Sequence, residues 1–265
     1  MISVDARGRM GNAMFQLAFA HAASRRLQTS FVFGPAPLWE QFELGPWGRR
    51  SVRLRRKLVF RTKYGANPTD RVFIEANADP GAVMATLRDG VAYGGFFQSE
   101  RYFAGYEDEI RALFTVRGEH LAEFSHRYGW LSRYVCMHVR RTDYLDQSAL
   151  ALPRSYFSDA LAAVPGRESL DLVVVSDDPD GVRTELADLG EFHIAANPPL
   201  TDFLLLMNAN VVITSNSSFS WWAAWLNTEP GVRVLVPQHW LGFARGVEVP
   251  RDVIPERWSV VPVRR

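Results

Sequence analysis

The second half of this 265-residue chain alternates short apolar segments with helical ones, and no other feature constrains the fold as strongly. The apolar segments are mostly Val-rich and show no regular polar alternation: Tyr134–Val139, Leu170–Val175, Phe192–Ile194, Val211–Thr214 and Val232–Val236. The helical segments are Ser155–Val164, Asp180–Leu189, Thr201–Asn208 and Ser217–Leu226. Strands without polar alternation are apolar on both faces, as in parallel sheets that helices cover. We therefore expect an α/β fold whose C-terminal half is a parallel sheet with helices on both faces.

The first half of the chain also begins as a strand–loop–helix unit. A strand at Ile2–Asp5 leads through a glycine-bearing loop into a helix from about Asn12 to Leu27, which is apolar around most of its circumference and should be buried. We expect further strands and helices at Val72–Ile74, Pro80–Leu87, Ala92–Phe97 and Ser99–Phe114. A chain of this length has room for two domains of roughly 100–150 residues. We place these domains at residues 1–130 and 131–265.

Composition excludes several broad classes of protein. Hydrophobic residues make up 47% of the chain and charged residues 22%, as is typical of soluble globular proteins. The formal net charge of +1 gives no general attraction to nucleic acid. The single cysteine, Cys136, allows no intrachain disulfide, which fits a reducing compartment.

The sequence predicts a cytoplasmic protein. No run approaches the roughly 20 apolar residues that a membrane span needs, and Met1–Arg9 lacks the apolar region of a secretory signal. A basic run within Arg49–Lys63 is either a solvated face or a surface that meets anionic lipid or an anionic acceptor. Peripheral contact with the inner face of the membrane therefore stays open.

Polar residues follow three of the expected strands at the point where each strand ends. They are the segments His138–Tyr144, Ser176–Asp178 and Ser215–Ser218. In open parallel sheets, ligands bind beyond the carboxyl ends of the strands. Because three strands deliver polar loops to one edge, we expect a ligand crevice there.

The segment Ser215, Asn216, Ser217 and Ser218 precedes a helix, whose first backbone N–H groups have no partner within the helix. Those groups and the helix dipole favour an anion such as phosphate. The alternative is an ordinary N-cap made by Ser215 or Asn216.

Two arginines, Arg140 and Arg141, lie at the end of one strand and alternate between its faces. An arginine fork matches the oxygens of a phosphate. We expect one arginine to bind the donor and the other to form an ion pair with Asp143, although a buried network with Asp143 and Asp177 would satisfy both. His138 shares a face with Arg140, so it either bonds a base or phosphate or fills polar core space.

The acidic string Asp177, Asp178, Pro179 and Asp180 contains a D-x-D pattern that could hold Mg²⁺ or Mn²⁺. We expect no metal, because arginine and a helix N-terminus already serve the phosphates. Asp180 is then expected to cap the following helix, and Asp177 to contact a ribose hydroxyl or brace an arginine.

Near the N-terminus, Gly8 and Gly11 form only part of a dinucleotide motif, and no P-loop lysine follows. Gly11 and Asn12 could face the same crevice from the other domain.

Four segments carry longer motifs in one order along the chain. They are Gly8–Gln16, similar to G-G-L-G-N-Q-M-F-Q; Gly94–Phe103, similar to G-Y-F-Q-S-E-x-Y-F; His138–Tyr144, similar to H-V-R-R-G-D-Y; and Ser215–Leu226, similar to S-N-S-T-F-S-W-W-x-A-W-L. In these segments the chain resembles glycosyltransferase family 11, the α-1,2-fucosyltransferases, most of all the bacterial ones. Ala13 and Thr142 depart from the family's Gln and Gly, which bears on the acceptor and linkage more than on the donor.

The resemblance implies a GT-B architecture, in which two Rossmann-like domains face a central cleft and the C-terminal domain holds GDP-fucose. It implies inversion at the fucose anomeric carbon without a metal or other cofactor. By motif, Arg140 would hold the pyrophosphate, Ser217 and Ser218 would bind phosphate, and His138 and Asp202 would lie near the guanine. Asn12 and Gln16 would lie near the fucose or the acceptor. The expected donor-binding set is Gly11, Gln16, His138, Arg140, Arg141, Asp177, Asp202, Ser215, Asn216, Ser217 and Ser218.

The expected reaction is fucosyl transfer to a hydroxyl of a glycan, with a galactoside α-1,2 linkage in surface polysaccharide or oligosaccharide synthesis. Donors aimed at the charge on the departing diphosphate stabilise the transition state more than the ground state. Arg140, Asp143 and Asn12 are the expected catalytic residues, and Asp143, Glu100 and Asp5 are candidates for the base. The alternatives are another nucleotide-sugar donor on the same scaffold and a non-catalytic glycan-binding relative.

Overall fold

The computed structural model describes residues 1–34, 37–44, 70–145 and 150–264. The basic run within Arg49–Lys63 lies outside these residues, so its interpretation stays a prediction. Among the described residues, no helix is both long enough and apolar enough to cross a membrane.

The chain divides into two compact units. The N-terminal unit comprises Met1–Gly118 and Pro250–Val253, and the C-terminal unit comprises Glu119–Val249 and Ile254–Arg265. The division comes at Gly118, earlier than the expected boundary at residue 130. The reason is α5 (Gly118–Tyr128), whose Tyr128 hydroxyl exchanges hydrogen bonds with the Asn197 side chain of the C-terminal unit.

The segment Pro250–Val253 returns to the N-terminal unit through specific polar contacts. The Ser99 hydroxyl donates to the carbonyl oxygen of Asp252 at 2.6 Å, and the Arg251 guanidinium lies 2.8 Å from the Asp79 carboxylate. The C-terminal stretch of the chain therefore contributes to both units.

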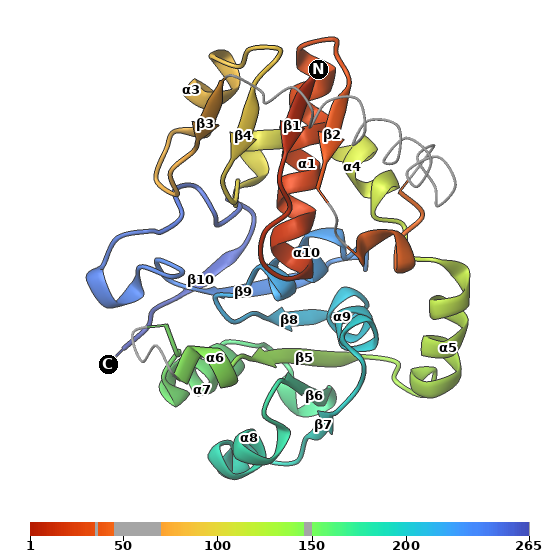
Figure 1. The fold of residues 1–265 in the computed structure, drawn as a ribbon. Coiled ribbons are helices and arrows are strands. Elements are labelled where there is room, and N and C mark those ends of the chain that lie inside the picture. Colours follow the sequence, from red (N-terminus) through yellow and green to blue (C-terminus); the bar gives the residue numbers. More distant parts are fainter. Residues whose placement is uncertain (35–36, 45–69, 146–149, 265) are drawn as a thin grey trace. The chain divides into compact units, whose positions relative to one another are not determined.

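The N-terminal unit is built on a four-stranded parallel sheet in the order β2-β1-β4-β3 (Figure 1). Its strands are β1 (Ile2–Val4), β2 (Phe31–Phe33), β3 (Arg71–Phe73) and β4 (Ala92–Gly94). Its helical elements are α1 (Met10–Arg26), η1 (Pro37–Glu40), α3 (Pro80–Ala85), η3 (Glu100–Phe103) and α4 (Glu107–Leu113). As expected, α1 is buried around most of its circumference, and its Phe19 ring stacks on Phe97 with centroids 3.8 Å apart.

Two expectations for this unit were wrong in detail. The single helix expected from Ser99 to Phe114 is two shorter helices, η3 and α4, because Gly105 between them takes the left-handed φ of +85°. The strand expected to reach Phe97 ends at Gly94, because Gly95 and Phe97 both have positive φ values that an extended strand does not accept.

The C-terminal unit contains a six-stranded sheet, parallel throughout, in the order β10-β9-β8-β5-β6-β7 (Figure 1). Its strands are β5 (Tyr134–Val139), β6 (Asp171–Ser176), β7 (His193–Ala195), β8 (Val211–Ile213), β9 (Arg233–Pro237) and β10 (Ser259–Val261). The main helices are α6 (Thr142–Leu145), α7 (Arg154–Ala162), α8 (Pro179–Glu185), α9 (Pro199–Met207) and α10 (Ser218–Leu226).

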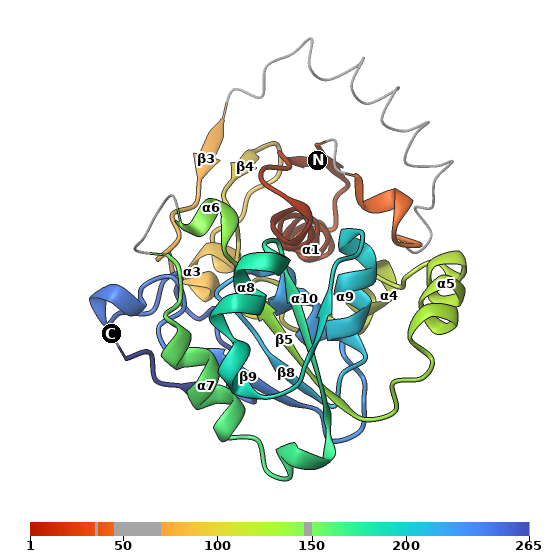
Figure 2. The same ribbon diagram turned by 90° about the horizontal axis from the view of Figure 1, so that it is seen from below.

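Helices cover both faces of this sheet, which the residues of β5 make clear. Val135, Met137 and Val139 belong to a buried cluster that includes residues of α7 and α8. The alternate residues face α9 and α10: the Tyr134 hydroxyl donates to the Leu205 carbonyl, and the His138 ring contacts Phe219. Figure 2 shows the same helices from below. The expected parallel sheet with helices on both faces is confirmed.

The order of strands reverses between β5 and β8. From β5 the sheet continues through β6 to β7, and from β8 it continues through β9 to β10 in the opposite direction. Such a switch point separates the loops that follow the two central strands and leaves a crevice at the carboxyl edge of the sheet. The polar segments after β5 and β8 lie on the two sides of this point.

Candidate functional site

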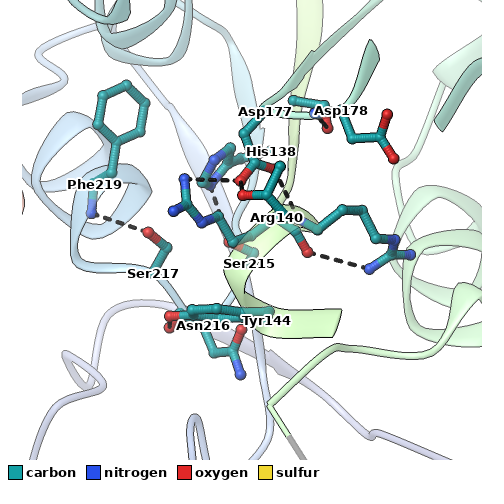
Figure 3. Close-up of polar contacts among 12 residues, drawn as sticks. His138, Arg140, Tyr144, Asp177, Asp178, Ser215, Asn216, Ser217 and Phe219 are labelled. Atoms are coloured by element: carbon teal, nitrogen blue, oxygen red, sulfur yellow. Dashed lines mark hydrogen bonds and ion pairs between the residues drawn. The ribbon is translucent and has the colours of Figure 1, made fainter. Parts of the chain in front are cut away.

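The polar segments after three strands meet at the carboxyl edge of the C-terminal sheet, as expected from the sequence. His138 and Arg140 come from the end of β5, Asp177 follows β6, and Ser215–Ser217 follows β8. Figure 3 shows these side chains together, with hydrogen bonds and ion pairs between them. The parallel strand alignment thus unites residues that are far apart in the sequence.

Arg140 forms an ion pair across the edge of the sheet. Its Nη1 lies 3.0 Å from Oδ2 of Asp177, and the side chains are 15% and 19% exposed. The guanidinium carbon also lies 5.8 Å from the centroid of the Tyr144 ring, within the range of a cation–π contact. Arg140 is therefore held in place but reachable from solvent, as a ligand-binding arginine must be.

Arg141 has a different role from Arg140, and its carboxylate partner is Glu185. Nε of Arg141 donates to Glu185 at 2.8 Å, and Nη2 makes a second hydrogen bond to the same carboxylate. Nη1 donates to the carbonyl oxygens of Leu152 and Arg140. The guanidinium of this buried residue, which is 5% exposed, also lies over the Phe157 ring. The geometry makes Arg141 a structural residue and argues against the donor contact expected for it.

Asp177 connects the loops after β5 and β6. Its carboxylate accepts hydrogen bonds from the Arg141 backbone N–H at 2.8 Å and from the Thr142 hydroxyl, besides pairing with Arg140. The expected bracing role of Asp177 is therefore present in the structure. Its contact with a ribose hydroxyl stays a prediction.

His138 is a buried, neutral histidine. Its Nδ1 and the Ser215 hydroxyl share a hydrogen bond of 2.9 Å, and its ring lies 5.4 Å from that of Phe219. Burial lowers the pKa of His138 from 6.5 to about 4, although the nearby Asp177 opposes this shift. At neutral pH the imidazole can therefore donate one hydrogen bond and accept another without carrying charge.

The start of α10 presents backbone N–H groups at the same edge. Ser217 is the N-cap: its hydroxyl oxygen accepts from the Phe219 N–H at 3.4 Å, and Ser218 is the first residue of the helix. Because Ser217 makes the cap, the alternative in which Ser215 or Asn216 does so was wrong. A helix of nine residues that begins here directs its dipole at the site.

Asn216 joins the loops after β5 and β8. Its backbone carbonyl accepts a hydrogen bond of 3.1 Å from the Tyr144 hydroxyl, and its Nδ2 donates to the Leu150 carbonyl at 2.9 Å. Its Oδ1 is buried without a hydrogen-bond partner in the described part of the chain. A buried acceptor without a donor is costly, so this oxygen is suited to accept from a bound ligand.

Asp202 lies in α9, 8% exposed. Its Oδ1 accepts from Nδ2 of Asn197 at 2.8 Å, and Asn197 in turn bonds the Tyr128 hydroxyl. Burial raises the pKa of Asp202 to about 6, although the Asn197 hydrogen bond and the charge of Arg127 lower it. Sequence reasoning missed Asn197 and Tyr128, because nothing in their local pattern marks them as partners of Asp202.

The pKa shifts of His138 and Asp202 predict opposite effects of pH on stability. A histidine whose pKa is lowered stabilises the fold above pH 6.5, and this contribution is lost as pH falls toward 4. A carboxyl whose pKa is raised destabilises the fold as pH rises from 3.8 to 6. We expect Asp202→Asn to raise the unfolding free energy at pH 7 by on the order of 2–3 kcal/mol. Chemical denaturation at pH 4 and pH 7 measures this change.

The comparison at pH 4 is the control for this prediction. There the Asp202 carboxyl of the folded protein is largely protonated, so Asp202→Asn should change stability little. The variant should also show stability that increases with pH between 4 and 6.5, because the opposing contribution of Asp202 is gone and that of His138 remains. An equal effect of the substitution at both pH values would contradict the burial of this carboxyl as its cause.

The predicted residues of the N-terminal unit form a network of amide side chains. The Arg7 backbone N–H donates to Oε1 of Gln16 at 2.8 Å, and Nε2 of Gln16 donates to the Gly95 carbonyl at 2.9 Å. Nε2 of Gln98 donates to Oδ1 of Asn12 at 2.7 Å. Gln16 is fully buried, so its side chain supports the loops before α1 and after β4.

The glycine loop before α1 fits closely around Asn12. Gly8 has φ +81°, and a Cβ placed on it would lie 2.4 Å from Nδ2 of Asn12. Gly11 is buried in the first turn of α1. The approach of Gly11, Asn12 and Gln16 to fucose or an acceptor stays a prediction.

The three candidates for a catalytic base lie in different parts of the chain. Asp5 follows β1 on the surface of the N-terminal unit, and Glu100 is the first residue of η3. The side chain of Asp143 lies outside the described part of the structure, although its backbone belongs to α6.

The residue that caps α8 is Asp178, which accepts from the Gly181 N–H at 3.2 Å, so the cap expected of Asp180 was wrong.

Comparison with known proteins places this site in a family. Residues 91–242, more than half of the chain, match the model of glycosyl transferase family 11. The chain belongs to glycosyl transferase family 11. The match covers the segments at Gly94–Phe103, His138–Tyr144 and Ser215–Leu226 that suggested the family from the sequence, and that expectation is confirmed.

Two relatives of this family 11 chain come from Escherichia coli, and others come from animals. An alpha-1,2-colitosyltransferase of Escherichia coli is 30% identical over 190 residues, which cover 66% of this chain and 64% of that protein. The O-antigen biosynthesis glycosyltransferase WbnK of Escherichia coli is 23% identical, with coverage of 88% and 92%. A galactoside 2-alpha-L-fucosyltransferase of Caenorhabditis elegans is 26% identical, with coverage of 65% and 53%. The chain thus spans less than two thirds of the first and third of these relatives.

Solved structures with the same fold are fucosyltransferases of the GT-B type. The fucosyltransferase NodZ from Bradyrhizobium has a TM-score of 0.53 at 14% identity, covering 84% of this chain and 91% of that one. POFUT1 in complex with GDP has a TM-score of 0.52 at 11% identity, covering 89% and 97%. At these identities the likeness shows the fold alone, and it confirms the expected GT-B class. The central cleft concerns the relative placement of the two units and stays a prediction.

The described residues contain no cluster of three or more His, Cys, Asp or Glu side chains suited to a metal ion. A reaction without a metal or other cofactor stays a prediction.

Proposed function

We propose that this family 11 chain transfers fucose from GDP-fucose to a hydroxyl group of an acceptor glycan, with inversion at the anomeric carbon. The observation that carries the proposal is the placement of Arg140 after β5 at the switch point of the C-terminal sheet, with α10 beginning after the neighbouring strand β8 (Figure 3). A guanidinium fork and a helix N-terminus at one edge are the groups that a diphosphate requires. The fucosyltransferases among the relatives and solved structures support the choice of sugar.

In the proposed reaction, the bond between the fucose anomeric carbon and the β-phosphate oxygen breaks as the acceptor oxygen forms the new glycosidic bond. The electron pair of the broken bond stays on the diphosphate, and GDP leaves with this added charge. Arg140 and the backbone N–H groups of α10 stabilise that charge in place, without reorganisation. The acceptor proton passes to a base or to water, and Asp5, Glu100 and Asp143 remain the candidates for this base.

The remaining site residues fit roles around the nucleotide. Asp202 and the neutral His138 are placed near the guanine in this proposal, and their burial suits the recognition of a flat base with few waters. Ser217 and Ser218 begin the helix that would meet the phosphates. Asp177 fixes Arg140, so it contributes to phosphate binding through that side chain.

The proposed acceptor is a galactoside, joined by an α-1,2 linkage, in surface polysaccharide or oligosaccharide synthesis. The galactoside 2-alpha-L-fucosyltransferase and the O-antigen glycosyltransferase among the relatives support this choice. The alpha-1,2-colitosyltransferase favours a second candidate, colitosyl transfer with the same linkage. A location in the cytoplasm, with membrane contact through Arg49–Lys63, belongs to the same proposal and can be tested by cell fractionation.

The proposal is tested by incubating the purified chain with GDP-fucose and a panel of galactosides. We expect GDP release that depends on the acceptor, a product heavier by one fucosyl group, and an α-1,2 linkage by NMR. A parallel reaction with a colitosyl donor ranks the two sugars by kcat/KM. A chain that neither binds GDP-fucose nor releases GDP would refute the proposal.

Tyr144 is expected to position Arg140 and the loop after β8. Replacing Tyr144 with phenylalanine keeps the ring beside the guanidinium and removes the hydrogen bond to the Asn216 carbonyl. A net hydrogen bond is worth about 0.5–1.5 kcal/mol, so we expect KM for GDP-fucose to rise about two- to tenfold. Titration of GDP by calorimetry measures the same loss without turnover.

Tyr144→Leu is the second arm of this experiment. It also removes the aromatic ring beside Arg140 and should weaken GDP binding further than Tyr144→Phe. If both variants bind GDP as the parent chain does, Tyr144 does not position the site.

A further inference from the structure

A cavity of about 560 Å³ opens at the amino-terminal edge of the C-terminal sheet. It is lined by residues from η4 (Arg167–Ser169) and from the starts of β6 and β7. Its polar and aromatic lining comprises Arg167, Glu168, Asp171, Glu191, Phe192 and His193. A cavity of this size falls within the range of small-molecule sites.

The cavity is separate from the site around Arg140. β6 begins with Asp171 at the cavity and ends with Ser176, directly before Asp177 at the other edge. Six residues of strand span roughly 16–20 Å. A small molecule bound at one edge therefore does not reach the other.

The lining combines acceptors with a donor that lacks a partner. The carboxylates of Glu168, Asp171 and Glu191 only accept hydrogen bonds when ionised, whereas a guanidinium only donates. Nη1 of Arg167 donates to the Leu170 carbonyl at 2.6 Å, but its Nε is buried without a partner in the described part of the chain. Three carboxylates disfavour an anionic ligand, while hydroxyl groups can use the acceptors and the donors together.

An exposed indole lies beside this cavity. Trp130 is 56% exposed, and its ring meets His193 edge to face with centroids 5.0 Å apart. The chain around it is anchored, because the hydrogen bonds of Tyr128 with Asn197 hold the end of α5 two residues earlier. A large aromatic face that stays in solvent offers an apolar surface to the C–H face of a sugar ring.

We propose that the cavity, with Trp130 at its rim, is a second carbohydrate site that binds a neutral stretch of glycan chain. The inference rests on the proposed function, since it assumes that the acceptor glycan of that reaction can be longer than a disaccharide. The distance along β6 implies that a mono- or disaccharide bound for transfer does not use the second site. A longer glycan, or a second glycan molecule, can occupy the second site.

The test compares binding of two probes to the full chain. The probes are lactose and a neutral hexasaccharide of three N-acetyllactosamine repeats, measured by calorimetry and by hydrogen–deuterium exchange. We expect the hexasaccharide to protect backbone amides in 167–172 and 191–193, and Trp130→Ala to weaken its binding about five- to tenfold. Asp171→Asn should weaken it as well, while lactose binding and transfer to lactose should be unchanged in both variants.

Phe73→Ala is the matched control, because Phe73 is also 56% exposed but lies in the N-terminal unit. It should bind the hexasaccharide as the parent chain does. Equal hexasaccharide affinity in Trp130→Ala, or no protection at the cavity, would overturn the inference, as would tighter binding of oligolysine or inorganic phosphate at these segments. The binding assay needs no GDP-fucose. It therefore tests the second carbohydrate site even if the protein does not transfer fucose.

Discussion

An Arg140→Ala variant is expected to keep its fold and to lose about 10²–10³-fold in kcat. In the proposed reaction, Arg140 stabilises the charge that collects on the departing diphosphate. Its ion pair with Asp177 is partly exposed, so water can solvate the carboxylate once the guanidinium is gone. Asp177 also keeps its hydrogen bonds to the Arg141 N–H and the Thr142 hydroxyl, which preserves the loop. Steady-state kinetics with GDP-fucose and lactose, together with a thermal melt, measure both parts of this prediction.

Two further variants sharpen the Arg140 experiment. Arg140→Lys keeps the positive charge but loses the paired N–H donors of the guanidinium. Its kcat should therefore fall between those of the parent and of Arg140→Ala. Arg251→Ala removes another arginine–aspartate pair, with Asp79 in the N-terminal unit, and should leave kcat near that of the parent. Near-normal turnover of Arg140→Ala would remove the central element of the proposed mechanism.

An Arg141→Ala variant is expected to lose stability, by about 3 kcal/mol or more. Arg141 is almost completely buried, and its removal leaves the Glu185 carboxylate and the Leu152 carbonyl without their donor. Glu185 is partly exposed, which places the cost at the lower end of the range for a broken buried ion pair. For a domain of 150–250 residues this corresponds to a fall in Tm of roughly 6–12 °C. Differential scanning calorimetry measures the shift.

The companion variant is Arg141→Met combined with Glu185→Leu. Replacing a whole buried ion pair with apolar residues of similar size is often neutral, so the double variant should recover much of the lost stability. Arg140→Ala, which changes the neighbouring arginine, should melt close to the parent protein. If Arg141→Ala melts like Arg140→Ala and binds GDP poorly, Arg141 belongs to the donor site after all.

The fold of the C-terminal unit could be predicted because its strands are unusually apolar. β5, β6 and β8 are buried along most of their length and show no regular polar alternation, as in a sheet that is buried on both faces. The shared edge of the polar segments followed from the parallel order alone. The switch point between β5 and β8 could not be predicted, because the order of strands depends on crossovers that no local pattern records.

Within the site, sequence reasoning succeeded where neighbours along a strand decide the geometry and failed where a distant element supplies the partner. The periodicity of β5 placed His138 and Arg140 on one face, and Arg140 does lie at the edge. It could not supply Glu185 as the partner of Arg141, because that carboxylate comes from α8, 44 positions along the chain. It also could not reveal that the Gln16 amide accepts from the Arg7 N–H and donates to the Gly95 carbonyl.

The return of Pro250–Val253 to the N-terminal unit limits how this protein can be dissected. A recombinant fragment that stops at Gly118 lacks Asp252 and Arg251, so Ser99, Arg101 and Asp79 lose the contacts that hold their loops. A fragment that starts at Glu119 contains Pro250–Val253 but lacks the N-terminal residues that these four residues contact. The halves are thus not interchangeable modules, and chimaeras with other transferases should exchange this tetrapeptide together with the N-terminal half.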